Sequence, residues 1–359
     1  MTGRLERRPE VSAAALALAS LAAVAMTLLV GTVLVLWAGA PVAATYAALF
    51  AGGFGSVFAW TETLTRAVPL MFTGLAAAVA FRARLYNIGA EGQLYAGAMA
   101  AVALGGLHGG EPLGPPWLLW PAMLLAAALA GALLLLGPAW LKAQAGVDEV
   151  VTTLLLNFIV LLGVSALLDG PMKDPTAMGW PQSVALAGEL ELSRLIEGAR
   201  LHSGLLLALL LAVALWLLIT YTVPGFDIRA SGANPRAARF AGVPAGRTRV
   251  LVACLSGALA GVGGAVEVAG RTGYVTMDMS PGYGYTGIVI AMLAGQHPLA
   301  VVLAAVFVAG VLVGADAMSR VVGVPTYIAE VMVATALIAV LVATLAAQYR
   351  WRVDPAGQA

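Results

Sequence analysis

Long apolar runs, most of them close to 20 residues, recur along the chain and constrain its fold more than any other feature. A helix needs roughly 20 apolar residues to cross a bilayer core about 30 Å thick. Only 10% of the residues are charged and 61% are hydrophobic, whereas a soluble domain carries about 25% charged residues. The sequence therefore predicts an all-α polytopic membrane protein. The alternating segments of about ten residues that mark a transmembrane β-barrel do not occur.

The apolar runs predict about ten transmembrane helices in a single transmembrane domain that covers residues 1–359. We place the spans at 12–36, 62–81, 86–107, 117–138, 149–168, 204–223, 249–270, 284–295, 298–316 and 326–347. The first run is much longer than the 7–15 apolar residues of a signal peptide, so we interpret it as an uncleaved helix. The eighth run is too short for a full crossing unless it is broken or tilted.

The distribution of arginine and lysine predicts the orientation, because cytoplasmic loops carry an excess of both. An even number of spans with a cytoplasmic N-terminus places 13 of the 19 basic residues inside. The six that fall outside are Arg66, Lys173, Arg194, Arg200, Arg271 and Arg320. We therefore expect both termini in the cytoplasm of a bacterial cell (inner) membrane, an external loop at 169–203 and a cytoplasmic loop at 224–249.

Catalytic and metal-binding patterns are absent from the sequence. Neither lysine is followed by Ser or Thr, so the chain lacks the Gly-Lys-Ser/Thr of a P-loop. The three histidines are scattered and Cys254 is the only cysteine, which argues against a metal site. "GYGYTG" at 282–287 matches a dinucleotide-binding pattern, but it opens a membrane segment, where its glycines favour a bend or close helix packing. We expect no catalytic residue, metal or bound cofactor. A lipid-modifying enzyme or an intramembrane protease would need a polar constellation that the sequence lacks.

The segment "LYNIGAEGQLYAGAMA" at 85–100 carries unusual polarity for a membrane span. In a continuous helix, Asn87, Glu91 and Tyr95 would share one face and Gln93 would point the opposite way. Such residues usually face a cavity or another helix rather than lipid. Two interpretations stay open: these four residues lie along a substrate pathway, or Glu91 is a structural brace neutralised by arginines 82 or 84.

Three further polar positions lie within predicted spans. Asn157 is a candidate for the pathway, although a hydrogen bond to a neighbouring helix is favoured. Glu267 is also a pathway candidate, and an ion pair with Arg271 at i+4 is favoured for it. Glu62 and Arg66 have the same spacing and favour a structural pair.

The cytoplasmic loop predicts a short capped helix. Asn234 is suited to the N-cap and Pro235 to the first turn, and Gly242 followed by Pro244 would end the helix. A short helix with exposed alanines on the cytoplasmic face indicates docking into another protein. A basic loop held against anionic lipid is the alternative.

These segments resemble a known family. The loop is similar to the coupling helix of ABC importer permeases, and "LYNIGAEGQLYAGAMA" resembles the third-span signature of nucleoside and simple-sugar permeases in the branched-chain amino acid/ribose group. "ARFAGVPAGRTRVLVACLSGALAGVGGAVEVAG" and "GYGYTGIVIAMLAGQHPLAVVLAA" are similar to later blocks of that family. Arg236 stands where the family's EAA-type loop begins with glutamate, which weakens any salt bridge expected there.

The resemblance implies a type II ABC importer-like permease bundle. It implies three protein partners: a second homologous permease, a cytoplasmic ATPase that uses ATP and magnesium, and an extracytoplasmic substrate-binding protein. Membrane lipid surrounds the bundle, and nucleic acid is not expected. The residues expected to couple to the ATPase are Asn234, Pro235, Arg236, Ala237, Ala238, Arg239, Ala241 and Gly242.

The resemblance also implies the cargo, a nucleoside or a simple sugar, with nucleoside favoured by "NIGAEGQ". The small number of charges in the spans suits a neutral polar solute.

A different class of protein also fits the polar spans: a proton-coupled secondary transporter that uses Glu91 or Glu267 as a proton carrier. Such a transporter would need no docking loop.

Overall fold

The computed structural model describes residues 2–7, 13–107 and 111–354, and most of these residues form helices. The helices are α1 (Ala13–Trp37), α2 (Val42–Phe54), α3 (Val57–Arg82), α4 (Ala90–Gly105), α5 (Pro116–Ala145), α6 (Glu149–Asp169), α7 (Gly204–Tyr221), α8 (Val223–Ala233), α9 (Pro235–Phe240), α10 (Ala245–Glu267), α11 (Tyr283–Leu293), α12 (Pro298–Val322) and α13 (Thr326–Gln348). Two short elements, the 3-10 helix η1 (Gly188–Leu190) and the π-helix η2 (Val268–Thr272), complete the helical part. The predicted helical class is confirmed.

The prediction of ten spans is not reproduced helix by helix. Within the described residues, six helices are long and apolar enough to cross a membrane: α3, α5, α6, α7, α10 with η2, and α12. A seventh crossing is possible if α1 and α2 form one broken span, since Leu21–Trp37 and Val42–Phe54 meet at 117°. α4 and α11 are shorter, and α2 and α8 lie where the sequence predicted connecting segments.

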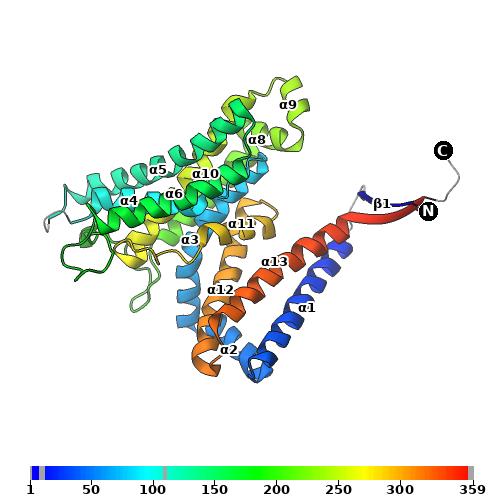
Figure 1. Cartoon of the computed structure of the whole chain (residues 1–359), viewed down its shortest axis with the longest axis horizontal. Helices are drawn as coiled ribbons and strands as arrows, with labels where there is room; N and C mark the ends of the chain where they lie inside the picture. Colours follow the sequence, from blue (N-terminus) through cyan, green and yellow to red (C-terminus); the bar gives the residue numbers. More distant parts are fainter. Residues whose placement is uncertain (1, 8–12, 108–110, 355–359) are drawn as a thin grey trace. The chain divides into compact units, whose positions relative to one another are not determined.

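The described chain forms two compact units, one from residues 1–59 and 310–359 and the other from residues 60–309. Figure 1 shows the helices of both units. In the first, α1 packs against α13, and a cluster of apolar side chains that includes Val35, Met318 and Met332 forms the core. In the same unit, strands β1 (Thr2–Arg7) and β2 (Tyr349–Asp354) pair antiparallel next to the chain ends. The sequence did not predict this ribbon.

The second unit is built around α10, which packs closely against α4 and α5. Glycines of α10 make this approach possible, since a Cβ added to Gly257 would meet the backbone of Gly131 on α5. Likewise, a Cβ added to Gly97 on α4 would meet the backbone of Gly261. Gly257 and Gly261, spaced as GxxxG, thus allow α10 to pack closely against its neighbours.

Loop 170–203 folds back onto this unit rather than extending away from it. Backbone hydrogen bonds join Leu186 N to Gly273 O (2.7 Å) and Leu192 N to Ala269 O (2.8 Å). Leu190 of η1 is fully buried in a core shared with α4, α5 and α10. Beyond η1, residues 191–200 form no helix, because these backbone bonds hold the segment in an irregular conformation.

His202 closes this loop in a fully buried position. Neither ring nitrogen has a hydrogen-bond partner among the described residues, and the ring packs against Gly204 and Gly270. Burial, followed by the positive charges of Arg194 and Arg271, lowers the pKa of His202 to about 4. The buried imidazole of His202 is therefore neutral at physiological pH.

Candidate functional site

The polar residues before α4 form a buried hydrogen-bonded hub. Asn87 and Gln93 bond reciprocally through their side-chain amides, at 2.9 and 3.0 Å. Asn87 Nδ2 also donates to Ser256 Oγ of α10 (2.9 Å), and that hydroxyl donates to Ala76 O of α3 (2.8 Å). Asn87 Oδ1 further accepts the backbone N–H of Gly89 (2.9 Å). One asparagine thus connects α3, α4 and α10.

This hub corrects the expected geometry of residues 86–107. The chain is not helical from 86 onward, because α4 begins only at Ala90. Asn87 therefore lies before the helix and does not continue the face of Glu91 and Tyr95. Gln93 contacts Asn87 instead of pointing away from it. The physical reason is that Asn87 bonds to the backbone two residues on, a turn-forming arrangement that competes with helix.

Glu91 stabilises the start of the short helix α11. Its Oε2 accepts the backbone N–H of Gly284 at 2.6 Å, in the first turn of α11. An anionic group is stabilised at a helix N-terminus by the unpaired N–H groups there. The side chain is 3% exposed. Glu91 is therefore a structural brace in this conformation, but its partner is α11 rather than the arginines that the sequence suggested.

The expected close packing around "GYGYTG" is also present. Gly282 has φ +85° and precedes α11, and a Cβ added to Gly284 would meet the backbone of Glu91. Thr73 of α3 donates its hydroxyl to Tyr283 O (2.9 Å). The start of α11 is thus held from both α3 and α4.

Asn157 links α6 to the same region. Its Nδ2 donates to Ile88 O (2.8 Å) and to Tyr285 Oη (3.2 Å), and its Oδ1 accepts the N–H of Gly92 (2.9 Å). The side chain is 1% exposed. The favoured interpretation of Asn157 as a link between helices is confirmed.

Tyr95 and Glu267 lie elsewhere in this unit and are buried too. Tyr95 Oη donates to Met277 O (2.5 Å) and accepts the N–H of Ser280 (3.2 Å) in the segment before α11. Glu267 is fully buried and pairs with Arg271, as its spacing favoured. Glu62 pairs with Arg200 of loop 170–203 at 3.8 Å, a partner that the sequence did not suggest. All six pathway candidates therefore contact protein groups and have little or no exposure.

The second candidate region is α9, at one end of this unit in Figure 1. Asn234 Oδ1 accepts the N–H groups of Arg236 (3.0 Å) and Ala237 (3.1 Å), which caps the helix start. Pro235 occupies the first turn. The helix ends at Phe240, and Gly242 follows with φ +86°, a conformation that favours glycine. The predicted cap, first turn and stop are all confirmed.

Exposure on α9 differs from the expectation in two ways. Ala237 is exposed, but Ala238 is only 6% exposed, so the prediction of two outward-facing alanines is wrong for the second. The six-residue helix directs one face back onto the protein, and Ala238 lies on that face. Phe240 is 97% exposed, and sequence reasoning passed over it. An aromatic residue at the end of a capped loop helix, two residues before the glycine stop, was the signal that could have identified it.

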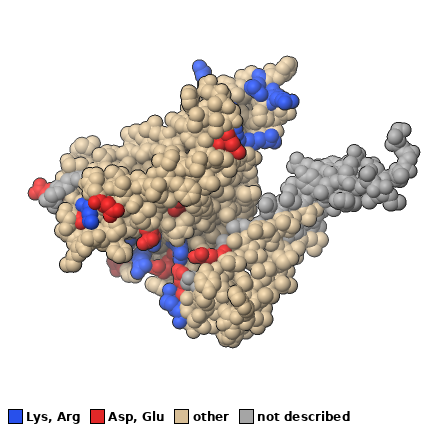
Figure 2. All heavy atoms as spheres, viewed as in Figure 1, with Lys and Arg blue, Asp and Glu red and all other residues tan. Residues whose placement is uncertain are grey.

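Lysine and arginine side chains gather around α8 and α9, whereas uncharged residues dominate the helical surface beside them (Figure 2). Arg229, Arg236 and Arg239 belong to this region and are exposed. Among the described residues, no group of three or more His, Cys, Asp and Glu side chains could hold a metal ion. His108 lies outside the described residues.

Six helices among the described residues are long and apolar enough to cross a bilayer, and they define a multi-pass membrane protein. The chain belongs to the family described as the permease component of the branched-chain amino acid transport system, whose model matches residues 59–342. Members of this family are transport subunits rather than catalytic ones.

Named relatives support the same assignment. The chain is 37% identical over 321 residues to a glucose ABC transporter permease of Haloferax volcanii, which covers 85% of this chain and 82% of the relative. It is 35% identical to a guanosine ABC transporter permease of Bacillus subtilis, over 88% of this chain and 90% of the relative. It is 31% identical to a nucleoside ABC transporter permease of Lactococcus lactis, over 88% of both chains. The protein is accordingly a permease subunit of an ABC transporter of the import type.

Proposed function

We propose that this permease subunit carries a nucleoside, or alternatively a simple sugar, through a path formed with a second homologous permease. Two of the relatives above are named for guanosine or nucleosides and one for glucose. Overall identity does not separate the two cargo classes, so the preference for a nucleoside rests on "NIGAEGQ" at 87–93. The polar groups of that segment suit a neutral hydrogen-bonding solute.

The observation that carries the proposal is α9. Its start is capped, its end is fixed by Gly242, and Phe240 projects almost completely into solvent. Exposed aromatic residues are typical anchors of protein interfaces. A separate cytoplasmic ATPase would dock on Asn234–Gly242 and would use ATP and magnesium, while this chain binds neither.

The same arrangement supports an orientation. If α9 faces the ATPase, loop 170–203 at the other end of the second unit faces outward, where a substrate-binding protein would deliver the solute. The excess of basic residues predicted on the inner side independently supports a cytoplasmic location for both chain termini.

The buried hub would contribute to transport by positioning the short helices α4 and α11. Alternating access requires packed helices to shift between two arrangements. Asn87, Glu91 and Gln93 hold the broken ends of these helices in the present conformation. In this proposal they, together with Tyr95, Asn157 and Glu267, shape the path and become accessible to solute only when the helices move.

Reconstitution of the complex in proteoliposomes tests the proposal. The two permeases, the ATPase and the binding protein are combined, and uptake of radiolabelled guanosine and glucose is measured with ATP, without ATP, and with a pH gradient alone. We expect uptake of guanosine that requires ATP and the binding protein. ATP-dependent uptake of glucose alone would reassign the cargo. Uptake by this chain alone, driven by the pH gradient, would overturn the proposal in favour of a proton-coupled carrier.

A further inference from the structure

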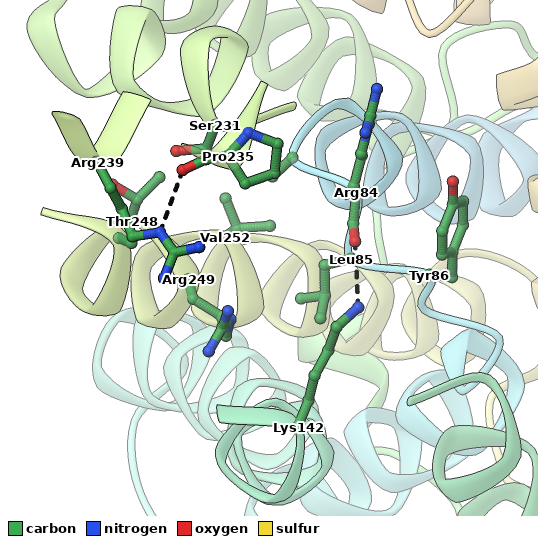
Figure 3. A pocket seen from close by; sticks show the side chains of 12 residues that line it. Arg84, Leu85, Tyr86, Lys142, Ser231, Pro235, Arg239, Thr248, Arg249 and Val252 are labelled. Atoms are coloured by element: carbon green, nitrogen blue, oxygen red, sulfur yellow. Dashed lines mark hydrogen bonds between the residues drawn. The ribbon is translucent and has the colours of Figure 1, made fainter. Parts of the chain in front are cut away.

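A cavity of about 400 Å³ lies beside α9 and is lined by four cationic residues. Figure 3 shows its walls, which come from the α3–α4 turn, the end of α5, and helices α8, α9 and α10. The cationic residues are Arg84, Lys142, Arg239 and Arg249. No Asp or Glu lines the cavity.

The local backbone fixes two of these cations with respect to the cavity. Arg84 has φ +56°, and its guanidinium donates to Ala233 O at 3.3 Å, which ties the α3–α4 turn to the end of α8. Arg239 Nε donates to Pro235 O at 3.2 Å, which holds its side chain along α9 (Figure 3). Since a guanidinium has five N–H donors, both residues retain donors for another acceptor.

The positive charge is compensated only in part. Lys142 forms an ion pair with buried Glu149 and also donates to Arg84 O at 3.4 Å. Within the described part of the chain, Arg84, Arg239 and Arg249 form no ion pair. Three arginines therefore surround one cavity without a carboxylate partner, an arrangement that favours an anionic ligand.

A hydroxyl group also points to a missing acceptor. Ser231 Oγ lies within the cavity wall, is shielded from solvent, and has no hydrogen-bond partner among the described residues. Shielded polar groups without a partner are uncommon in folded proteins, since such a group has lost its hydrogen bonds to water. An anion in the cavity would supply an acceptor for this hydroxyl as well as for the arginines.

We propose that this cavity binds a phosphate group. Arginine pairs with phosphate in a bidentate geometry, and a phosphate offers several oxygens to the donors that line the cavity. Two sources share this chemistry: a soluble phosphate monoester and the headgroup of an anionic phospholipid. The binding site rests on the cavity alone, while its position on the cytoplasmic side rests on the proposed function.

The position of the cavity beside α9 suggests that an occupied site regulates transport. Arg239 belongs to α9, so an occupied cavity would hold the coupling helix against α8, α10 and the α3–α4 turn. If the proposed cargo is imported, a cytoplasmic kinase reaction that adds phosphate to it would generate a ligand of this class. The phosphorylated product would then bind beside the coupling helix and limit further uptake.

Binding to the full-length chain in nanodiscs of phosphatidylcholine tests the site without any transport assay. Uridine 5′-monophosphate is the soluble probe and uridine its phosphate-free counterpart. A second arm uses nanodiscs that contain phosphatidylglycerol, with retained lipid measured by native mass spectrometry. Saturable binding of either phosphate probe, but not of uridine, to this site supports the proposal and identifies the source.

Two arginines of α10 give a matched pair of variants. Arg249→Gln removes a cation that lines the cavity, whereas Arg247→Gln removes an exposed cation two residues away that does not. We expect about tenfold weaker phosphate binding for Arg249→Gln and no change for Arg247→Gln. Arg249→Lys keeps the charge and is expected to restore part of the affinity, which separates loss of the site from loss of the fold.

The pH dependence distinguishes the two sources further. A phosphate monoester loses its second charge as pH falls through about 6, so its binding is expected to weaken there. A lipid phosphodiester keeps its single charge and is expected to show no such change. Absence of binding in both arms, or an equal loss for both glutamine variants, would overturn the proposal. Uridine binding that Arg249→Gln leaves unchanged would belong to the transport path and not to this site.

Discussion

Two asparagines precede two helices of this permease, and they act in different ways. Asn87, before α4, is fully buried and bonds to Gln93 and Ser256 from two helices. Asn234, before α9, is exposed, and its side chain bonds to the backbone of its own helix. The buried residue fixes several elements with respect to one another, whereas the exposed one fixes only a local shape that a partner can recognise. Changes at the first should therefore affect folding, and changes at the second should affect assembly with the ATPase.

The largest effect is expected for Asn87→Leu. The substitution leaves the Gln93 amide and the N–H of Gly89 without their partner in a buried site. A loss of about 3 kcal/mol in folding free energy follows if two buried groups lose their bonds. The melting temperature of the purified chain in detergent measures it, with Asn234→Leu as the exposed counterpart. Similar melting temperatures for the two variants would contradict the comparison.

Two substitutions at Glu91 separate the contribution of its charge from that of its hydrogen bond. Glu91→Gln keeps an oxygen that can accept the Gly284 N–H, whereas Glu91→Ala removes it. We expect a cost of about 2 kcal/mol for alanine and less than 1 kcal/mol for glutamine. Thermal melting and recovery of the assembled complex are measured for both variants, and uptake is measured for glutamine. Normal assembly with lost uptake would show that Glu91 also acts in the path.

A smaller effect is expected for Asn234→Ala. Loss of an N-cap costs about 1 kcal/mol of local helix stability, and α9 has only six residues. The melting temperature of the whole chain should stay the same, while amide exchange within α9 rises and binding of the ATPase weakens several-fold. Asn234→Ser retains a capping oxygen and should behave like the natural protein. A drop in global stability would show that α9 is part of the core.

The smallest effect concerns pH and loop 170–203. His202 has a pKa near 4 in the folded protein, below its unfolded value of 6.5, so the unfolded loop binds more protons. Stability is complete above pH 6.5 and is lost progressively as pH falls towards 4. Between pH 7 and 5.5 the expected loss is about 1 kcal/mol. Amide protection factors across residues 170–203, which are corrected for the intrinsic exchange rate at each pH, should fall over this range, and His202→Gln should remove the dependence.

The sequence was most informative where local chemistry decides the structure. The cap, first turn and stop of α9 follow from Asn234, Pro235 and Gly242, and all three are as predicted. The GxxxG spacing of Gly257 and Gly261 also predicts close helix packing, because small residues in an apolar span let two backbones approach each other.

Tertiary contacts explain what the sequence could not predict. Helical spacing placed Gln93 opposite Asn87, but Asn87 lies before the helix and bonds both to Gln93 and to Ser256, far away in the chain. The partner of Glu91 is a backbone N–H almost 200 residues later, and backbone donors carry no sequence signal. The burial of Ala238 depends in the same way on the surface beneath a very short helix. The pathway role of the buried residues stays a prediction.

The most direct test compares Phe240→Asp with Asn87→Leu in the assembled transporter. Recovery of the ATPase with the tagged permease is measured alongside the melting temperature of the permease alone. Phe240 is 97% exposed and Asn87 is buried. We predict that Phe240→Asp lowers ATPase recovery at least tenfold with an unchanged melting temperature, and that Asn87→Leu lowers the melting temperature. Full ATPase recovery with Phe240→Asp would contradict the assignment of α9 as the docking helix.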